Sequence, residues 1–253
     1  MKFFILAIYL LCQSASAAPY YRFWRGFKKK DISTQKFHQG LNSIFIPRTI
    51  DQGKKKGLLA YLPVLSPKTK SASIPEEVAL VVYSNRDDYQ TLRKSPAGQV
   101  YGKLHWDYFA KGISKSLVPS PLPLVGELVR NHAYDVLSSP KDWQKGYVIY
   151  SLKTRRLDTS NTSFQRAFKN YIKFMSSSYG RGKLESLIVL VGETYTIEYQ
   201  LWKNRPDYFN VRKDPKHIQA LKKLSLYLGP YQEHPLPQKI RSISFGQGLN
   251  TRF

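Results

Sequence analysis

The sequence predicts an α+β fold in which two modules follow one another, each with the element order strand-helix-strand-strand-helix-strand. Two observations carry this prediction. Apolar segments of strand length alternate with stripes of apolar residues at spacings of three and four, as in amphipathic helices. The same order occurs twice within 253 residues, starting near residues 20 and 147. A hydrophobic content of 42% suffices for a packed core and excludes a disordered tail.

The first half of the chain supplies one complete copy of this order. Residues 20–26 alternate between aromatic and basic side chains, which is typical of a strand. Ser33 is a suitable N-cap for a helix that ends or kinks at Pro47. The remaining elements expected here are strands over 58–65, 78–83 and 116–118, a helical region opened by Asn85, and a helix over 99–110.

The second half repeats the order. Strands are expected over 147–150, 184–191, 194–201 and 240–245. Two apolar helix stripes are expected, one with Phe164, Phe168, Tyr171, Ile172 and Met175, the other with Ile218, Leu221, Leu224 and Leu228. The segment 194–201 alternates, so one face of that strand carries Tyr195, Ile197, Tyr199 and Leu201.

Each half therefore has the ferredoxin-like order β-α-β-β-α-β, an open antiparallel sheet with helices on one face. The bare face of each sheet must be covered, and packing the two sheets together covers both. The sequence thus predicts two tandem ferredoxin-like modules forming a pseudo-dimeric α/β barrel within one chain. The expected divisions are a signal peptide over 1–17, module 1 over 18–118, a connector over 119–143 with a helix-like segment at 128–137, and module 2 over 144–253.

The N-terminus predicts export. A basic start, Met1-Lys2, precedes an apolar run of about ten residues and the small-residue sequence Ala15-Ser16-Ala17, as in a secretory signal peptide. The apolar run is shorter than the roughly 20 residues that a membrane span needs. Cleavage after Ala17 would remove Cys12, the only cysteine, and leave a periplasmic or secreted protein that needs no disulfides.

Several segments between residues 20 and 120 resemble the dimeric α/β-barrel superfamily, which includes antibiotic-biosynthesis-type and haem-degrading monooxygenases. The segments that carry the resemblance are 21–26, 45–47, 62–63, 75–83 and 98–106. The second half matches by element order alone. Members of this superfamily usually pair two modules into a barrel, and here one chain supplies both. The resemblance implies a fold and not one activity.

The resemblance also implies a pocket in each module between the sheet and its helices. In the haem-degrading branch, a histidine on the second helix binds the iron, and an asparagine of the first strand and a tryptophan shape the site. His105 and Trp106 lie on the expected second helix, so they are the candidate catalytic residues. The first strand contains no asparagine, so this oxygenase machinery is incomplete. Haem is the one cofactor that the resemblance suggests.

Charge is the second functional signal. Forty Lys and Arg against 17 Asp and Glu give a formal charge of +23, whereas solubility needs a magnitude of about 2 to 8. The surplus predicts an anionic partner, either a small ligand, a membrane or an envelope polymer. Nucleic acid is the least favoured partner, because the aromatic residues beside the charges are expected in the core. Arg22, Trp24 and Arg25 on the first strand are the candidate ligand-binding residues.

Two hypotheses of function remain. The first is a binding protein that uses an apolar pocket between the modules and a basic rim for an anionic ligand. The second is a monooxygenase or haem-binding oxidoreductase that uses the module 1 pocket. The sequence contains no nucleophile elbow, P-loop or dinucleotide-binding fingerprint. It also lacks the His, Cys, Asp or Glu spacings typical of metal sites, so no metal is expected. A further reading is that module 2 has lost its pocket and only closes the barrel.

Overall fold

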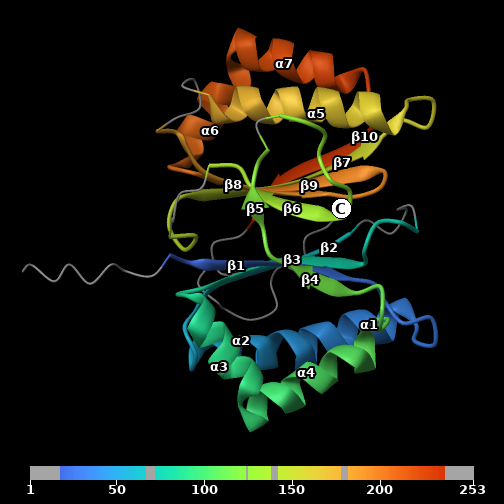
Figure 1. The fold of residues 1–253 in the computed structure, drawn as a ribbon, viewed down its shortest axis with the longest axis vertical. Helices are drawn as coiled ribbons and strands as arrows, with labels where there is room; N and C mark the ends of the chain where they lie inside the picture. The colour runs from blue at the N-terminus through green and yellow to red at the C-terminus, as the bar shows by residue number, and fades with distance from the viewer. Residues whose placement is uncertain (1–17, 67–71, 124, 138–141, 178–181, 237–253) are drawn as a thin grey trace, which may run out of the picture.

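A computed structural model of the chain describes residues 18–66, 72–123, 125–137, 142–177 and 182–236. Two sheets lie face to face in the middle, and helices cover the outer face of each (Figure 1). The expected signal peptide over 1–17 and the expected strand over 240–245 lie outside the described residues. No described helix is both long enough and apolar enough to cross a membrane.

Module 1 has the predicted ferredoxin-like topology. Its antiparallel sheet has the strand order β2-β3-β1-β4. The strands are β1 (Tyr20–Gly26), β2 (Leu58–Leu65), β3 (Glu77–Tyr83) and β4 (Lys115–Leu117). The helices are α1 (Thr34–Gly40), the π-helical turn η1 (Leu41–Phe45), α2 (Ile46–Lys54), α3 (Arg86–Lys94) and α4 (Pro96–Tyr108).

The helices of module 1 begin where the sequence provides caps. Ser33 accepts a hydrogen bond from the backbone of Lys36, and Asn85 accepts one from the backbone of Asp88. The break expected at Pro47 is the turn η1, after which α2 continues with Pro47 in its first turn. The wider turn accommodates the proline because a π-helix shifts the hydrogen-bonding partners by one residue.

Module 2 repeats the topology and adds two strands. Its six-stranded sheet has the order β10-β7-β9-β8-β6-β5. The elements of the module are β7 (Tyr147–Arg155), α5 (Asn161–Ser176), β8 (Leu184–Val191), β9 (Tyr195–Trp202), α6 (Arg205–Lys213), α7 (Pro215–Ser225) and β10 (Leu228–Pro235). Leu228, expected on a helix face, instead begins β10, because Gly229 and Pro230 follow it and end the helical pattern.

The connector supplies the two added strands, β5 (Ser120–Pro121) and β6 (His132–Asp135). The prediction of a helix-like segment over 128–137 is wrong for its central part, since β6 pairs antiparallel with β8. The free edge of β8 offers unpaired backbone groups, and pairing with the connector satisfies them.

The two sheets pack against each other, as predicted. Tyr195, Ile197, Tyr199 and Leu201 are all buried in one apolar cluster with residues of module 1. The Tyr199 hydroxyl donates a hydrogen bond of 2.8 Å to the carbonyl oxygen of Leu62 across the interface. The ring of Tyr199 also lies 5.5 Å from that of Phe23, edge to face. Side chains thus fill the layer that the first hypothesis assigned to a ligand, and the cavities described below lie on the helical sides.

Candidate functional site

A cavity of about 620 Å³ lies in module 1 between the sheet and the helices. Its walls come from β1, β2, β3 and β4 on one side and from η1, α2, α3 and α4 on the other. Aromatic side chains dominate these walls: Trp24, Phe45, Tyr61, Tyr83, Tyr89, Tyr101, His105 and Trp106. This is the place where the resemblance implies a pocket, and its size falls within the range of ordinary small-molecule sites.

Strand β1 divides the predicted binding residues between two faces. Arg22 and Trp24 both line the cavity. Arg25 points to the opposite face, where it is buried and donates a hydrogen bond of 2.6 Å from Nη1 to Oδ1 of Asn131 in the connector. Successive side chains of a strand alternate between faces, so residues 22 and 24 share a site that residue 25 cannot reach. Arg25 therefore does not join the other two at the cavity.

His105, on α4, lies among aromatic rings at the cavity wall. Its ring centroid is 5.1 Å from that of Trp24, 4.7 Å from that of Phe45 and 4.8 Å from that of Tyr101. Nδ1 lies 3.1 Å from the carbonyl oxygen of Tyr101. Burial lowers the pKa of His105 to about 4. The imidazole is therefore neutral at pH 7, and donation from Nδ1 to the carbonyl leaves Nε2 as the unprotonated nitrogen.

Trp106 follows His105 on α4 and also lines the cavity, but it lies at the edge. Its exposed fraction is 37%, and its ring centroid is 6.2 Å from that of His105. Adjacent residues of a helix point in different directions, so the two side chains occupy different depths of the site.

Arg22 is held in place at the cavity wall. Its Nε donates a hydrogen bond of 2.9 Å to Oγ of Ser116 on β4, and its guanidinium carbon lies 4.8 Å from the ring centroid of Tyr89. A guanidinium that is stacked on one side and hydrogen-bonded on another is preorganised to bind a carboxylate.

The charges around this cavity have one sign. Among the described residues that line it, four are cationic and none is a carboxylate; the cations are Arg22, Arg93, Lys103 and Lys115. The walls therefore combine aromatic surfaces with donors for a negatively charged group.

Glu77 lies directly behind the wall. It has no exposed surface, and it accepts hydrogen bonds from Trp24 Nε1 at 2.8 Å and from the Tyr61 hydroxyl at 3.3 Å. Burial raises the pKa of Glu77 to about 7, although both hydrogen bonds favour the ionised form. Glu77 was not among the site residues predicted from the sequence. Its position two residues before Ala79 on β3 places it on the same face as Val81 and Tyr83, which was the available signal.

The equivalent space in module 2 is filled by a buried polar chain. Lys153 of β7 forms an ion pair with Glu198 of β9, and both side chains are almost fully buried. Gln200 Nε2 donates to Oε2 of Glu198 at 2.7 Å, and Trp202 Nε1 donates to Oε1 of Gln200 at 3.0 Å. The helix-facing side of this sheet is thus occupied by its own side chains, which supports the interpretation that module 2 closes the barrel.

No cluster of three or more His, Cys, Asp or Glu side chains suited to a metal ion occurs in the described part of the chain.

Comparison with known proteins gives similarity at the level of structure. No protein-family model matches the sequence, and no curated protein does. Two similar structures are proposed monooxygenases. One, from Lactobacillus acidophilus, has 10% identity and a TM-score of 0.45 over 87% of this chain and 93% of the other. The other, from Fusobacterium nucleatum, has 13% identity and a TM-score of 0.46 over 87% and 92%.

A cofactor-independent oxygenase of Streptomyces nogalater matches 45% of this chain over its whole length, with 10% identity and a TM-score of 0.30. At these identities the similarity concerns the arrangement of elements and carries nothing about activity. The topology of the chain itself, two ferredoxin-like sheets packed face to face, confirms the predicted fold.

Proposed function

We propose that module 1 binds a flat aromatic small molecule that carries a negative charge. One observation carries the proposal: a cavity of about 620 Å³ has aromatic walls and four cationic lining residues, with no carboxylate among the described residues that line it. Aromatic walls favour a planar apolar body, and the fixed guanidinium of Arg22 favours a carboxylate or a similar anion. This is the binding hypothesis of the sequence analysis, moved from the barrel interior to the helical side of module 1.

The test compares two probes that differ in charge. Binding of 2-naphthoate and of uncharged 2-naphthalenemethanol is followed by fluorescence of the tryptophans, two of which line the cavity. Arg22→Gln should weaken naphthoate binding at least tenfold and leave the alcohol unchanged, because a charge-assisted hydrogen bond contributes about 1.5–3 kcal/mol. Arg205→Gln is the matched control, since Arg205 stacks on Phe209 in module 2. Equal losses for both probes, or no binding of either, would refute the proposal.

A second candidate function is haem binding, and the state of His105 favours it. A neutral imidazole with a free Nε2, oriented by its hydrogen bond to Tyr101, is chemically suited to bind the iron of haem. His105 would hold the iron, and the cationic residues at the wall would pair with the propionates. Bound haem would supply the redox chemistry of a monooxygenase-type enzyme.

The haem proposal has a spectroscopic test that does not depend on activity. Added haemin should give a Soret band that His105→Ala abolishes. The control is His132→Ala, because His132 lies in the connector and bonds Ser120 instead. If the spectrum of haemin does not change, or if both variants retain the band, haem binding by His105 is rejected.

We also propose that the chain is exported and that its positive charge attracts it to an anionic membrane or envelope polymer. The basic start, the short apolar run and the Ala15-Ser16-Ala17 sequence support export, and a charge of +23 supports an anionic surface. N-terminal sequencing of the protein recovered from the source cells should give Ala18 as the first residue. Retention of the start at Met1 would refute cleavage.

A further inference from the structure

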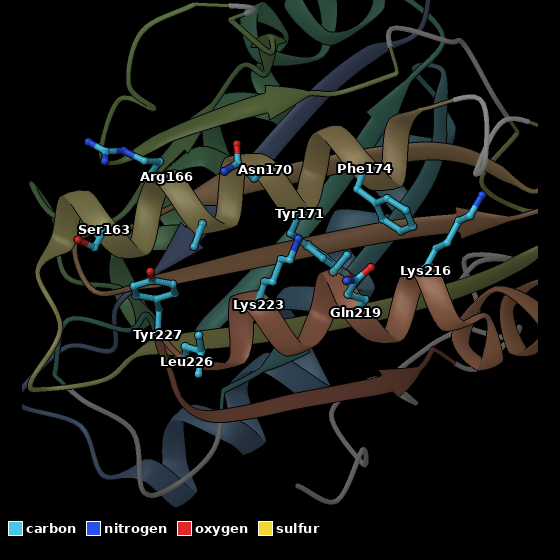
Figure 2. A pocket seen from close by; sticks show the side chains of 12 residues that line it. Ser163, Arg166, Asn170, Tyr171, Phe174, Lys216, Gln219, Lys223, Leu226 and Tyr227 are labelled. Atoms are coloured by element: carbon cyan, nitrogen blue, oxygen red, sulfur yellow. The ribbon is translucent and has the colours of Figure 1, made fainter.

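A second hollow lies on the outer face of module 2, between helices α5 and α7, with a volume of about 720 Å³ (Figure 2). Helices α5 and α7 lie on the opposite side of the two sheets from the module 1 helices that line the first cavity (Figure 1). We call it the α5–α7 groove. The proposed function does not use it.

The floor of the groove is apolar. Ala167 of α5 and Ala220 of α7 are small, partly buried residues that line it, and Phe174 and Tyr227 add aromatic surface. Leu226, just beyond α7, lines one end and is 64% exposed. Small residues between two helices leave room for the side chains of a third element to pack. The residues of α5 that line the groove run from Ser163 to Phe174, a stripe of about 16 Å at 1.5 Å per residue.

The rim of the groove is cationic. Arg166 of α5 and Lys216 and Lys223 of α7 line it, and no carboxylate does so among the described residues. None of these three side chains takes part in a salt bridge within the described part of the chain. Figure 2 shows Lys223 extending from α7 toward α5 across the hollow. Three unpaired cations beside an apolar floor favour an occupant with both an acidic and an apolar side.

Charge complementarity excludes two occupants from the same chain. Residues 237–253 contain Lys239, Arg241 and Arg252 and no Asp or Glu, so that segment would be repelled by the rim. A second copy of the protein carries a formal charge of +23 and, groove against groove, would present the same cationic rim, so charge repulsion opposes its binding. An acidic molecule other than this chain fits the rim better than either.

The solvent exposure of the groove indicates which kind of acidic molecule fits it. Arg166, Asn170, Lys216, Gln219, Lys223 and Leu226 are all exposed, so an occupant would keep one side in water. An amphipathic helix satisfies that condition, because it buries one face and leaves the other hydrated. A flat bilayer would not enter the hollow between two helices, and a polyanion without apolar groups would leave the floor uncovered.

We propose that the α5–α7 groove binds an acidic amphipathic helix of a partner protein. About eleven residues of such a helix would match the 16 Å stripe. Its acidic residues would pair with Arg166, Lys216 and Lys223, and its apolar residues would pack on Ala167 and Ala220.

The test uses the full chain and two synthetic helical peptides of fourteen residues labelled with a fluorophore. One carries Glu on its polar face and Leu and Ala on the other, and the second has Lys in place of each Glu. Fluorescence anisotropy should show saturable binding of the acidic peptide alone. Lys223→Glu should weaken this binding at least tenfold, whereas Lys222→Glu, the adjacent exposed lysine outside the groove, should weaken it less than twofold.

Ala220→Phe provides an independent variant, because it fills the floor without changing charge and should also weaken binding. Arg22→Gln should leave peptide binding unchanged, so this proposal and that for module 1 can fail separately. Equal losses in the Lys222 and Lys223 variants would show attraction by overall charge and overturn the proposal. Binding to vesicles with anionic lipid that depends on Lys223, without peptide binding, would assign the groove to a membrane and overturn it as well.

Discussion

The indole Nε1 of Trp24 donates a hydrogen bond of 2.8 Å to Oε2 of Glu77, a side chain without exposed surface. One residue forms the wall of the module 1 cavity and the other lies behind it. Because burial raises the pKa of Glu77 to about 7, the proton on this carboxyl group is gained and lost around neutral pH. Both the stability of module 1 and its affinity for anions therefore depend on one protonation equilibrium.

Glu77→Gln should remove one pH dependence of stability. In the unfolded chain the Glu77 carboxyl has its ordinary pKa of 4.5, so it loses its proton as pH rises through that value while the folded state keeps it. Wild-type stability should fall relative to the variant between pH 4.5 and about 7, by about 3 kcal/mol, and stay constant above that range. Urea unfolding of both proteins from pH 4 to 8 measures the difference.

His105 and His217 affect the pH dependence of stability in the opposite direction, and their contributions cancel when wild type and Glu77→Gln are compared. Burial lowers the pKa values of His105 and His217 to about 4, so these residues stay neutral in the folded state. Their contribution is lost as pH falls from 6.5 toward 4, where the unfolded chain takes up protons. Both are present in wild type and in Glu77→Gln. If the difference in stability between the two proteins stayed constant from pH 4.5 to 7, the raised pKa of Glu77 would be contradicted.

Anion binding in module 1 should weaken as pH rises through about 7. Ionised Glu77 adds a negative charge behind the wall and so opposes the binding of an anion in the cavity. The dissociation constant of 2-naphthoate should rise severalfold between pH 6 and 8 in wild type and stay level in Glu77→Gln. Titrations with uncharged 2-naphthalenemethanol at the same pH values are the control and should show no trend.

Tyr199→Asp should unfold both modules together. The Tyr199 side chain is fully buried between the sheets and bonds Leu62, so a carboxylate there would be buried without a partner. A loss above about 4 kcal/mol is expected, enough to abolish a cooperative unfolding transition, which calorimetry would test. Tyr199→Phe, which removes the hydroxyl alone, should cost about 1–2 kcal/mol. A Tyr199→Asp protein in which module 1 still melts cooperatively would show that the modules fold independently.

Lys153→Met should destabilise the chain by about 3–5 kcal/mol, because it leaves Glu198 buried and without its cation. Adding Glu198→Met should restore much of that stability, since the pair is then replaced by apolar groups of similar size. Urea unfolding of the single and double variants measures this coupling. A double variant that is no more stable than the single one would argue against an ion pair.

The repeated order of elements was predictable because each element carries its own signal. Ser33 and Asn85 cap helices as expected, and the alternation of Tyr195 and Tyr199 placed both on the buried face of β9. The added strand β6 was not predictable, because its pairing depends on the free edge of β8, which is distant in sequence. The pattern of residues within one short segment does not show which distant strand that segment will pair with.

The candidate site was predictable in part for the same reason. His105, Trp106, Arg22 and Trp24 share the cavity wall, as residues of one helix and one strand can. Glu77 was missed because its role comes from burial and from the indole of Trp24, 53 positions away. Arg25 was grouped with Arg22 by adjacency, whereas the two-residue period of β1 sends it to the other face.

Joining both halves of the barrel in one polypeptide makes its closure a unimolecular step. A barrel built from two separate subunits comes apart on dilution, whereas here the covalent link keeps the local concentration of each half high. The covalent link also removes the symmetry that identical subunits impose. The two halves can therefore differ in structure: module 1 has a cavity beside His105, and module 2 has the Lys153–Glu198 ion pair in the equivalent space.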